Sequence, residues 1–156
     1  MRMFLLVLVL SSSVFAGGKD FPMGPDARLT IGTLCDHPIE YRYPEQIAYC
    51  GRDVSTATKN EIFVAYRKLG FSLPSVTRAD YKIDHYVPLC MGGSNHPDNL
   101  WPQHVSIYKQ TDSLEEAICS KLRDGRISQA DAVKMMKAVK NNLSLVKQAF
   151  AALSRL

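Results

Sequence analysis

Apolar residues recur at helical spacing in four stretches of the chain. Residues three and four apart lie on one face of a helix, so this spacing predicts four amphipathic helices. The first begins at Thr58-Lys59-Asn60-Glu61, which has the form of a capping box, and stops at Gly70. The second runs from about His104 to Arg123, with one face formed by Ile107, Thr111, Leu114, Ile118 and Leu122.

The other two stretches follow Gly125, which is expected to end the second helix. Ser128 with Asp131 predicts the start of the third helix, whose apolar face carries Ala132, Val133, Met136 and Val139. The fourth stretch holds Leu145, Val146, Ala149, Phe150 and Leu153. The chain is therefore expected to be mainly helical from about residue 104 onward.

A different pattern lies upstream of the second helix. Residues 81–87 are β-prone and are closed by Pro88, and a turn with two glycines follows at residues 90–94, which predicts a strand and a tight return. Residues 17–57 are rich in Gly, Pro, Tyr and Asp and show little periodicity, as expected for an irregular arm. This order of elements predicts an α+β fold.

The first sixteen residues differ from the rest. Arg2 precedes an apolar run from Met3 to Leu10, and Val14-Phe15-Ala16 supplies small residues suited to signal peptidase. The run is short for a bilayer span of about 20 residues. Residues 1–16 are predicted to be a signal peptide, so the mature chain is expected to be periplasmic or secreted, with no stable membrane association. An uncleaved N-terminal anchor is the alternative.

Composition fits one compact domain. The chain has 156 residues, of which 46% are apolar and 22% charged, which suits a packed core and argues against global disorder. The net charge of +4 permits a polyanionic partner without requiring one. The basic excess lies in residues 103–156, with nine basic and five acidic residues. No internal repeat or heptad run appears, which argues against solenoids and coiled coils.

All four cysteines lie after the predicted signal peptide, at Cys35, Cys50, Cys90 and Cys119. An even count in an exported chain predicts two disulfides, because that compartment is oxidising. Four cysteines allow three pairings, of which the simplest is Cys35–Cys50 with Cys90–Cys119. A zinc site would need close cysteine pairs, which this chain lacks.

Residues 84–100, DHYVPLCMGGSNHPDNL, carry the densest pattern of chemically useful side chains. Asp84-His85 is followed by Pro88-Leu89, Gly92-Gly93 and Asn99-Leu100, with a fourteen-residue step from His85 to Asn99. This spacing resembles the HNH endonuclease motif of the ββα-metal nucleases.

The resemblance extends beyond the motif. Trp101-Pro102-Gln103 and residues 111–115 are similar to a small exported bacterial subset of that family. The resemblance implies a ββα-metal (HNH) core over residues 81–123, within a nuclease domain of residues 58–156 that ends in additional helices.

The chemistry of the residues agrees with this resemblance. Phosphodiester hydrolysis requires a base for water and a cation that stabilises charge on the phosphate. His85 is the candidate base because a neutral imidazole accepts a proton near physiological pH, and the Asp84 carboxylate suits a divalent cation. Asn99 is expected to hold the imidazole by accepting a hydrogen bond from one ring nitrogen. Because neighbouring strand residues point to opposite faces, Asp84 and His85 share a site only at a strand end or bulge.

The second metal ligand departs from the family pattern. The resemblance places a His or Asn about nine residues after Asn99, where this chain has Tyr108, a poor ligand for a hard cation when neutral. Asp112 is the favoured substitute and His104 the alternative, each one helical turn from Tyr108. A carboxylate shell predicts Mg²⁺ or Mn²⁺, whereas a shell with His104 admits Zn²⁺ or Ni²⁺.

The basic residues of the second helix are candidates for phosphate contacts or for a solvated face: Lys109, Lys121 and Arg123. Together these features predict an exported, disulfide-bonded hydrolase, an HNH-type endonuclease that cuts DNA, in preference to RNA, with little sequence specificity. Two alternatives stay open. One is a non-catalytic ββα module that binds nucleic acid, and the other is an exported, disulfide-rich interaction or effector protein.

Overall fold

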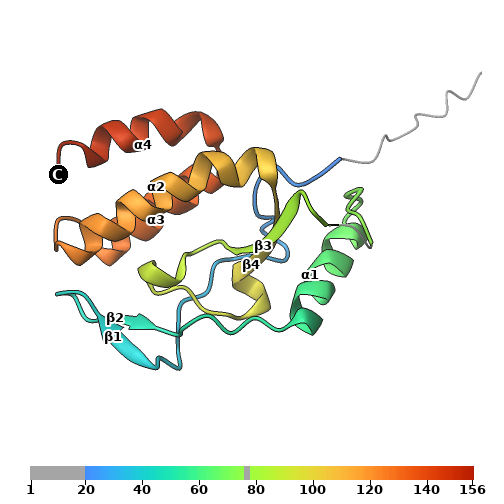
Figure 1. Cartoon of the computed structure of the whole chain (residues 1–156), viewed down its shortest axis with the longest axis horizontal. Helices are drawn as coiled ribbons and strands as arrows, with labels where there is room; N and C mark the ends of the chain where they lie inside the picture. The colour runs from blue at the N-terminus through green and yellow to red at the C-terminus, as the bar shows by residue number, and fades with distance from the viewer. Residues whose placement is uncertain (1–19, 76–77) are drawn as a thin grey trace, which may run out of the picture.

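The computed structural model describes residues 20–75 and 78–156, which form a mixed α+β protein (Figure 1). The predicted signal peptide, residues 1–16, lies outside the described residues. The strands are β1 (Glu40–Arg42), β2 (Ile47–Tyr49), β3 (Tyr81–His85) and β4 (Leu100–His104). The helices are α1 (Thr56–Lys68), α2 (Val105–Arg123), α3 (Gln129–Asn141) and α4 (Val146–Leu153), with short 3-10 turns η1 (Leu89–Met91), η2 (Pro97–Asn99) and η3 (Leu143–Leu145).

β3 and β4 form an antiparallel hairpin that leads directly into α2, with Asp84 paired to Trp101. The connection is not the tight return that the two glycines suggested, since residues 86–99 form a loop containing η1 and η2. Gly92 has a φ of +82°, and a Cβ on Gly93 would lie 1.8 Å from the carbonyl oxygen of Val87. Both glycines therefore let the loop fold back on itself at van der Waals contact.

The helices follow the predicted pattern, with one error at the start of α1. The predicted inner face of α2 is fully buried, and the Ser128 hydroxyl caps α3 by accepting from the Asp131 N–H. In α1 the cap is Ser55, whose hydroxyl accepts from the Thr58 N–H. The helix thus begins before the predicted box, inside the range assigned to the arm, because the Ser55 hydroxyl satisfies an N–H one turn earlier.

Two apolar clusters hold the helices and the hairpin together. Leu114, Ile118 and Met136 belong to one, which α2 shares with α3 and α4. Tyr66 and Trp101 belong to the other, which joins α1 to the β3–β4 hairpin. Figure 1 shows the corresponding arrangement, with α2, α3 and α4 together on one side and α1 against the far end of the hairpin.

The N-terminal arm is more regular than its sequence indicated. β1 and β2 form a short antiparallel hairpin. Upstream of β1 the chain runs beside the β3–β4 loop, where the Cys35 N–H donates to the Gly92 carbonyl and the Ser94 N–H donates to the Thr33 carbonyl. Strands of three residues carry too little alternation to be recognised in a sequence. The arm is therefore attached to the loop that leaves β3.

Both disulfides of the simplest pairing are present, Cys35–Cys50 and Cys90–Cys119. The first closes the arm around β1 and β2, and the second ties η1 to α2. Two disulfides are consistent with an exported or otherwise oxidising environment. Within the described ranges, no helix is long and apolar enough to cross a bilayer.

Candidate active site

A pocket of about 420 Å³ lies where β3, α2 and the arm meet. Its charged and titratable lining consists of Lys82, Asp84 and His85 from β3, Asp112, Glu115 and Glu116 from α2, and Arg52 from the arm. The Cys90–Cys119 disulfide forms part of its wall. The pocket thus gathers the predicted base and two predicted metal ligands, together with charged residues that the motif did not point to.

Asp84 and His85 both line the pocket because β3 ends at His85. Within a regular strand the two side chains would point to opposite faces of the hairpin. The prediction that Asp84 and His85 share a site only at a strand end or bulge therefore agrees with the end of β3 at His85. Both residues are buried, with exposed fractions of 4% and 3%.

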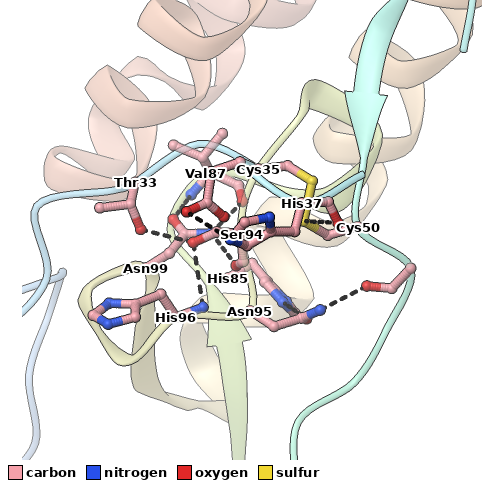
Figure 2. Close-up of a disulfide and its surroundings, with 12 residues drawn as sticks. Thr33, Cys35, His37, Cys50, His85, Val87, Ser94, Asn95, His96 and Asn99 are labelled. Atoms are coloured by element: carbon pink, nitrogen blue, oxygen red, sulfur yellow. Dashed lines mark hydrogen bonds and ion pairs between the residues drawn. A yellow bond between two sulfur atoms is a disulfide. The ribbon is translucent and has the colours of Figure 1, made fainter. Parts of the chain in front are cut away.

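Asn95, in the β3–β4 loop, holds the imidazole of His85 (Figure 2). The Nε2 atom of His85 lies 3.0 Å from the Asn95 side-chain oxygen, and the Asn95 amide nitrogen donates to the Gly51 carbonyl at 2.8 Å. Because the Gly51 carbonyl accepts only from the nitrogen end, the oxygen end faces His85 and Nε2 carries the ring proton. A neutral ring with that tautomer keeps a lone pair on Nδ1.

The surroundings of His85 favour this neutral form. Burial lowers the pKa of His85 below its ordinary value, and the positive charges of Arg52 and Lys140 act in the same direction. The hydrogen bond to Asn95 and the charge of Asp84 oppose the shift without cancelling it. At neutral pH the imidazole is therefore free to accept a proton.

The Asn99 side chain is not hydrogen-bonded to the imidazole of His85, contrary to the prediction. Its side-chain oxygen accepts from the Val87 N–H at 2.8 Å, and its amide nitrogen donates to the carbonyls of Val87 and Ser94, both at 2.9 Å. Asn99 is fully buried and fastens the loop that follows His85 (Figure 2). The hydrogen bond to the imidazole predicted for Asn99 is made by Asn95 instead, because the Asn99 amide is already engaged by backbone groups.

Lys140 is a buried partner of Asp84 that does not itself line the pocket, and the sequence patterns did not single it out. Its side chain is 0% exposed, and its ammonium donates to Asp84 Oδ2 at 2.9 Å, to the His85 carbonyl at 2.5 Å and to Glu115 Oε2 at 3.4 Å. Three acceptors satisfy the three N–H groups of an ammonium. Lys140 thus joins α3 to both β3 and α2 at the site.

The opposite charges of Asp84 and Lys140 favour the ionised form of each, whereas burial and the neighbouring carboxylates raise the pKa of Glu115 above its ordinary value. Burial alone would raise the pKa of Asp84, but Lys140 and Lys82 hold it below its ordinary value. Burial alone would lower the pKa of Lys140, but the carboxylates of Asp84 and Glu115 raise it above its ordinary value. Asp84 is therefore a carboxylate at neutral pH.

A second ammonium lies between the two candidate metal ligands. The Nζ atom of Lys82 is 3.7 Å from Asp84 Oδ1 and 2.7 Å from Asp112 Oδ1. It also lies 4.9 Å above the ring of Tyr108, the residue at the expected ligand position. A cation thus already bridges two hard oxygen donors, and this donor set suits Mg²⁺ or Mn²⁺. Within the described ranges, no three acidic, His or Cys side chains gather around one point as ligands.

His104, the alternative ligand, lies away from this pocket. It pairs with Tyr81 at the opposite end of the hairpin from His85, on the face opposite Asp84 because strand neighbours alternate. There it caps α2 by accepting from the Ser106 N–H and stacks on Phe21, with ring centroids 4.1 Å apart. The geometry thus brings Asp112, and not His104, to Asp84.

The three basic residues proposed for phosphate contacts lie on α2 outside the pocket lining. At about 100° per residue, Arg123 falls on the same face as Asp112, three turns further along the helix. Lys121 falls on the opposite face, and Lys109 lies one turn before Asp112. Of these three residues, Lys109 and Arg123 therefore lie nearer than Lys121 to the face of α2 that lines the pocket.

No protein-family model matches the chain, and comparison with the curated proteins and with the solved structures finds no match either.

Proposed function

We propose that this pocket is the active site of an exported, metal-dependent endonuclease, and that β3, β4 and α2 are the ββα-metal core of an HNH domain. The hairpin followed directly by a helix supports the second statement. One observation carries the first: Asp84, His85 and Asp112 line the same pocket. The motif and the resemblance independently predict these same residues as metal ligands and base.

His85 supplies the base for hydrolysis. Its neutral ring, held at Nε2 by Asn95, accepts a proton at Nδ1 from a water molecule. The water oxygen forms a bond to phosphorus, while the bond from phosphorus to the leaving sugar oxygen breaks. The leaving oxygen takes a proton from solvent, and His85 returns its proton to solvent. The products are a phosphomonoester and a free hydroxyl.

Asp84 and Asp112 are the residues that would hold the divalent cation. Bound Mg²⁺ or Mn²⁺ stabilises the negative charge that develops on the phosphate. The Lys82 side chain that now bridges the two carboxylates is 35% exposed. Because its stem is flexible and reaches solvent, Lys82 can give up this position to a metal ion.

DNA of any sequence is the proposed substrate class. Hydrolysis of the backbone requires only phosphate contacts, whereas base readout requires an element that enters a groove. Within the described ranges, the arm, α1, α3 and α4 pack against the hairpin and α2 and do not form a separate recognition domain.

A non-catalytic module that binds nucleic acid is the second candidate function. The observation that favours it is the engagement of Asp84 by two ammonium groups, Lys140 at 2.9 Å and Lys82 at 3.7 Å. If Lys82 holds its place against a divalent cation, the pocket keeps its charge pairs and lacks the metal. The two candidate functions therefore differ in whether the protein cleaves the nucleic acid that it binds.

The test uses the purified, oxidised chain from Gly17 to Leu156 on supercoiled plasmid. We expect nicked and then linear DNA with Mg²⁺ or Mn²⁺ and intact plasmid with EDTA, because the phosphate charge is then uncompensated. Far-UV circular dichroism of the same sample establishes that the protein is folded. Folded protein that retards the plasmid in a gel but leaves it uncut with every metal would support the non-catalytic module instead.

A further inference from the structure

Arg52 is a cation of the pocket that takes part in none of the ion pairs described above. Lys82 donates a hydrogen bond to Asp112, and Lys140 donates hydrogen bonds to Asp84 and Glu115. The guanidinium of Arg52 makes no hydrogen bond or ion pair with any residue of the described ranges, although it lines the same pocket. Among the described residues that line the pocket, Arg52 is thus the cation that is not paired with a carboxylate.

The backbone that carries Arg52 is fixed from two sides. Cys50, two residues earlier, is bonded to Cys35. The carbonyl of Gly51 accepts the Asn95 amide, and Gly51 has a φ of +65°, a conformation that favours glycine. Figure 2 shows this disulfide beside His85 and Asn95. The arm is therefore held in place next to the imidazole.

The same contacts couple Arg52 to His85. From Arg52, the connection runs through the Gly51 carbonyl to Asn95 and from Asn95 to Nε2 of the imidazole. Arg52 is also close enough for its charge to act on His85. A group that binds the guanidinium therefore lies near the proposed base.

We propose that Arg52 binds a non-bridging oxygen of the scissile phosphate and is the phosphate-binding residue of this pocket. This inference rests on the proposed function and names a substrate contact that neither the motif nor the resemblance supplied. A guanidinium presents a planar set of N–H donors that matches two phosphate oxygens. Four carboxylates line the pocket, namely Asp84, Asp112, Glu115 and Glu116, so an unpaired cation is needed to admit an anion.

The test separates a contact with the reacting phosphate from a contact with the rest of the polymer. Two substrates are compared with Mn²⁺: bis(p-nitrophenyl) phosphate, which has a single phosphate and no further backbone, and a short DNA duplex. The variants are Arg52→Gln and Arg52→Lys, with Arg123→Gln as the control. The control removes the same charge from α2, outside the pocket lining.

Arg52→Gln is expected to lower kcat/KM by about 10- to 100-fold on both substrates, and Arg52→Lys is expected to restore part of that loss. Arg123→Gln should affect only the duplex. Arg52 is exposed, so the melting temperature of the variants should equal that of the wild type. Wild-type kcat/KM on the small substrate for Arg52→Gln would overturn the inference.

A binding measurement keeps the inference testable if the protein does not cleave. In EDTA, fluorescence anisotropy of a labelled duplex gives its Kd for the same variants. A Kd raised about tenfold or more by Arg52→Gln, and less by Arg123→Gln, would support a phosphate site at Arg52 even if the wild type lacks activity. If the wild type does not cleave, the proposed enzyme is overturned. If Arg52→Gln and Arg123→Gln also raise the Kd equally, the inference about Arg52 is overturned as well.

Discussion

Replacing His85 with Ala is expected to lower kcat on a DNA duplex by about 10²- to 10⁴-fold, the range that general-base catalysis contributes. The imidazole is neutral, held by Asn95 and placed beside Asp84 in one pocket. No other histidine of the described residues lines that pocket. The residual rate would come from the metal ion and from substrate binding.

The matched control for this variant is His96→Ala. His96 lies in the same loop as Asn95, but its side chain is 61% exposed and does not line the pocket. Its removal should change kcat less than about twofold. Mn²⁺ binding, followed by electron paramagnetic resonance, should persist in His85→Ala because the carboxylates of Asp84 and Asp112 remain. Equal rates for the two His→Ala variants would show that the base is another group.

Replacing Lys140 with Met is expected to lower the free energy of unfolding by about 3–5 kcal/mol, the usual effect of removing one partner from a buried ion pair. Met retains most of the apolar stem but leaves the carboxylates of Asp84 and Glu115 without their shared cation. The backbone carbonyl of His85 loses a donor as well. Urea unfolding monitored by circular dichroism measures the change.

Lys134→Met is the control for this second variant. Lys134 lies on the same helix, α3, and is exposed, so its replacement should change the free energy of unfolding by less than about 0.5 kcal/mol. If Lys140→Met unfolds at the same urea concentration as Lys134→Met, the cluster under Asp84 does not stabilise the fold.

Much of the fold was predictable because it follows from periodicity and capping. The buried face of α2, its end at Gly125 and the Ser128 cap of α3 all match the sequence pattern. The exceptions depend on tertiary contacts. The three-residue strands β1 and β2 are stabilised by pairing and a disulfide, and neither contribution leaves a periodic signal.

Of the candidate site, only the residues in the short motif or at a fixed distance from it were predictable from the sequence. Asp84 and His85 could be selected together because the motif is contiguous, and Asp112 because of its distance from that motif. The sequence could not decide which of two nearby asparagines holds His85, since Asn95 and Asn99 offer the same amide. Asn95 is oriented toward His85 by its hydrogen bond to the Gly51 carbonyl, which belongs to the arm and is distant in the sequence.

The sequence does contain a signal for the burial of Lys140. It lies four residues after Met136 and eight after Ala132, so it continues the buried stripe of α3. A lysine on such a stripe requires an anionic partner, because burial of an unpaired ammonium is costly. The partners themselves, on β3 and α2, could be known only from the fold.

The most direct test of the account is the hydrolysis of a short DNA duplex in H₂¹⁸O with Mn²⁺, followed by mass spectrometry of the products. If water activated by His85 attacks phosphorus, each cut made by the wild type places a single ¹⁸O atom in the new phosphomonoester. His85→Ala should then give almost no labelled product in the same time. The account would be contradicted by intact duplex with folded wild-type protein, or by cuts whose phosphate carries no ¹⁸O.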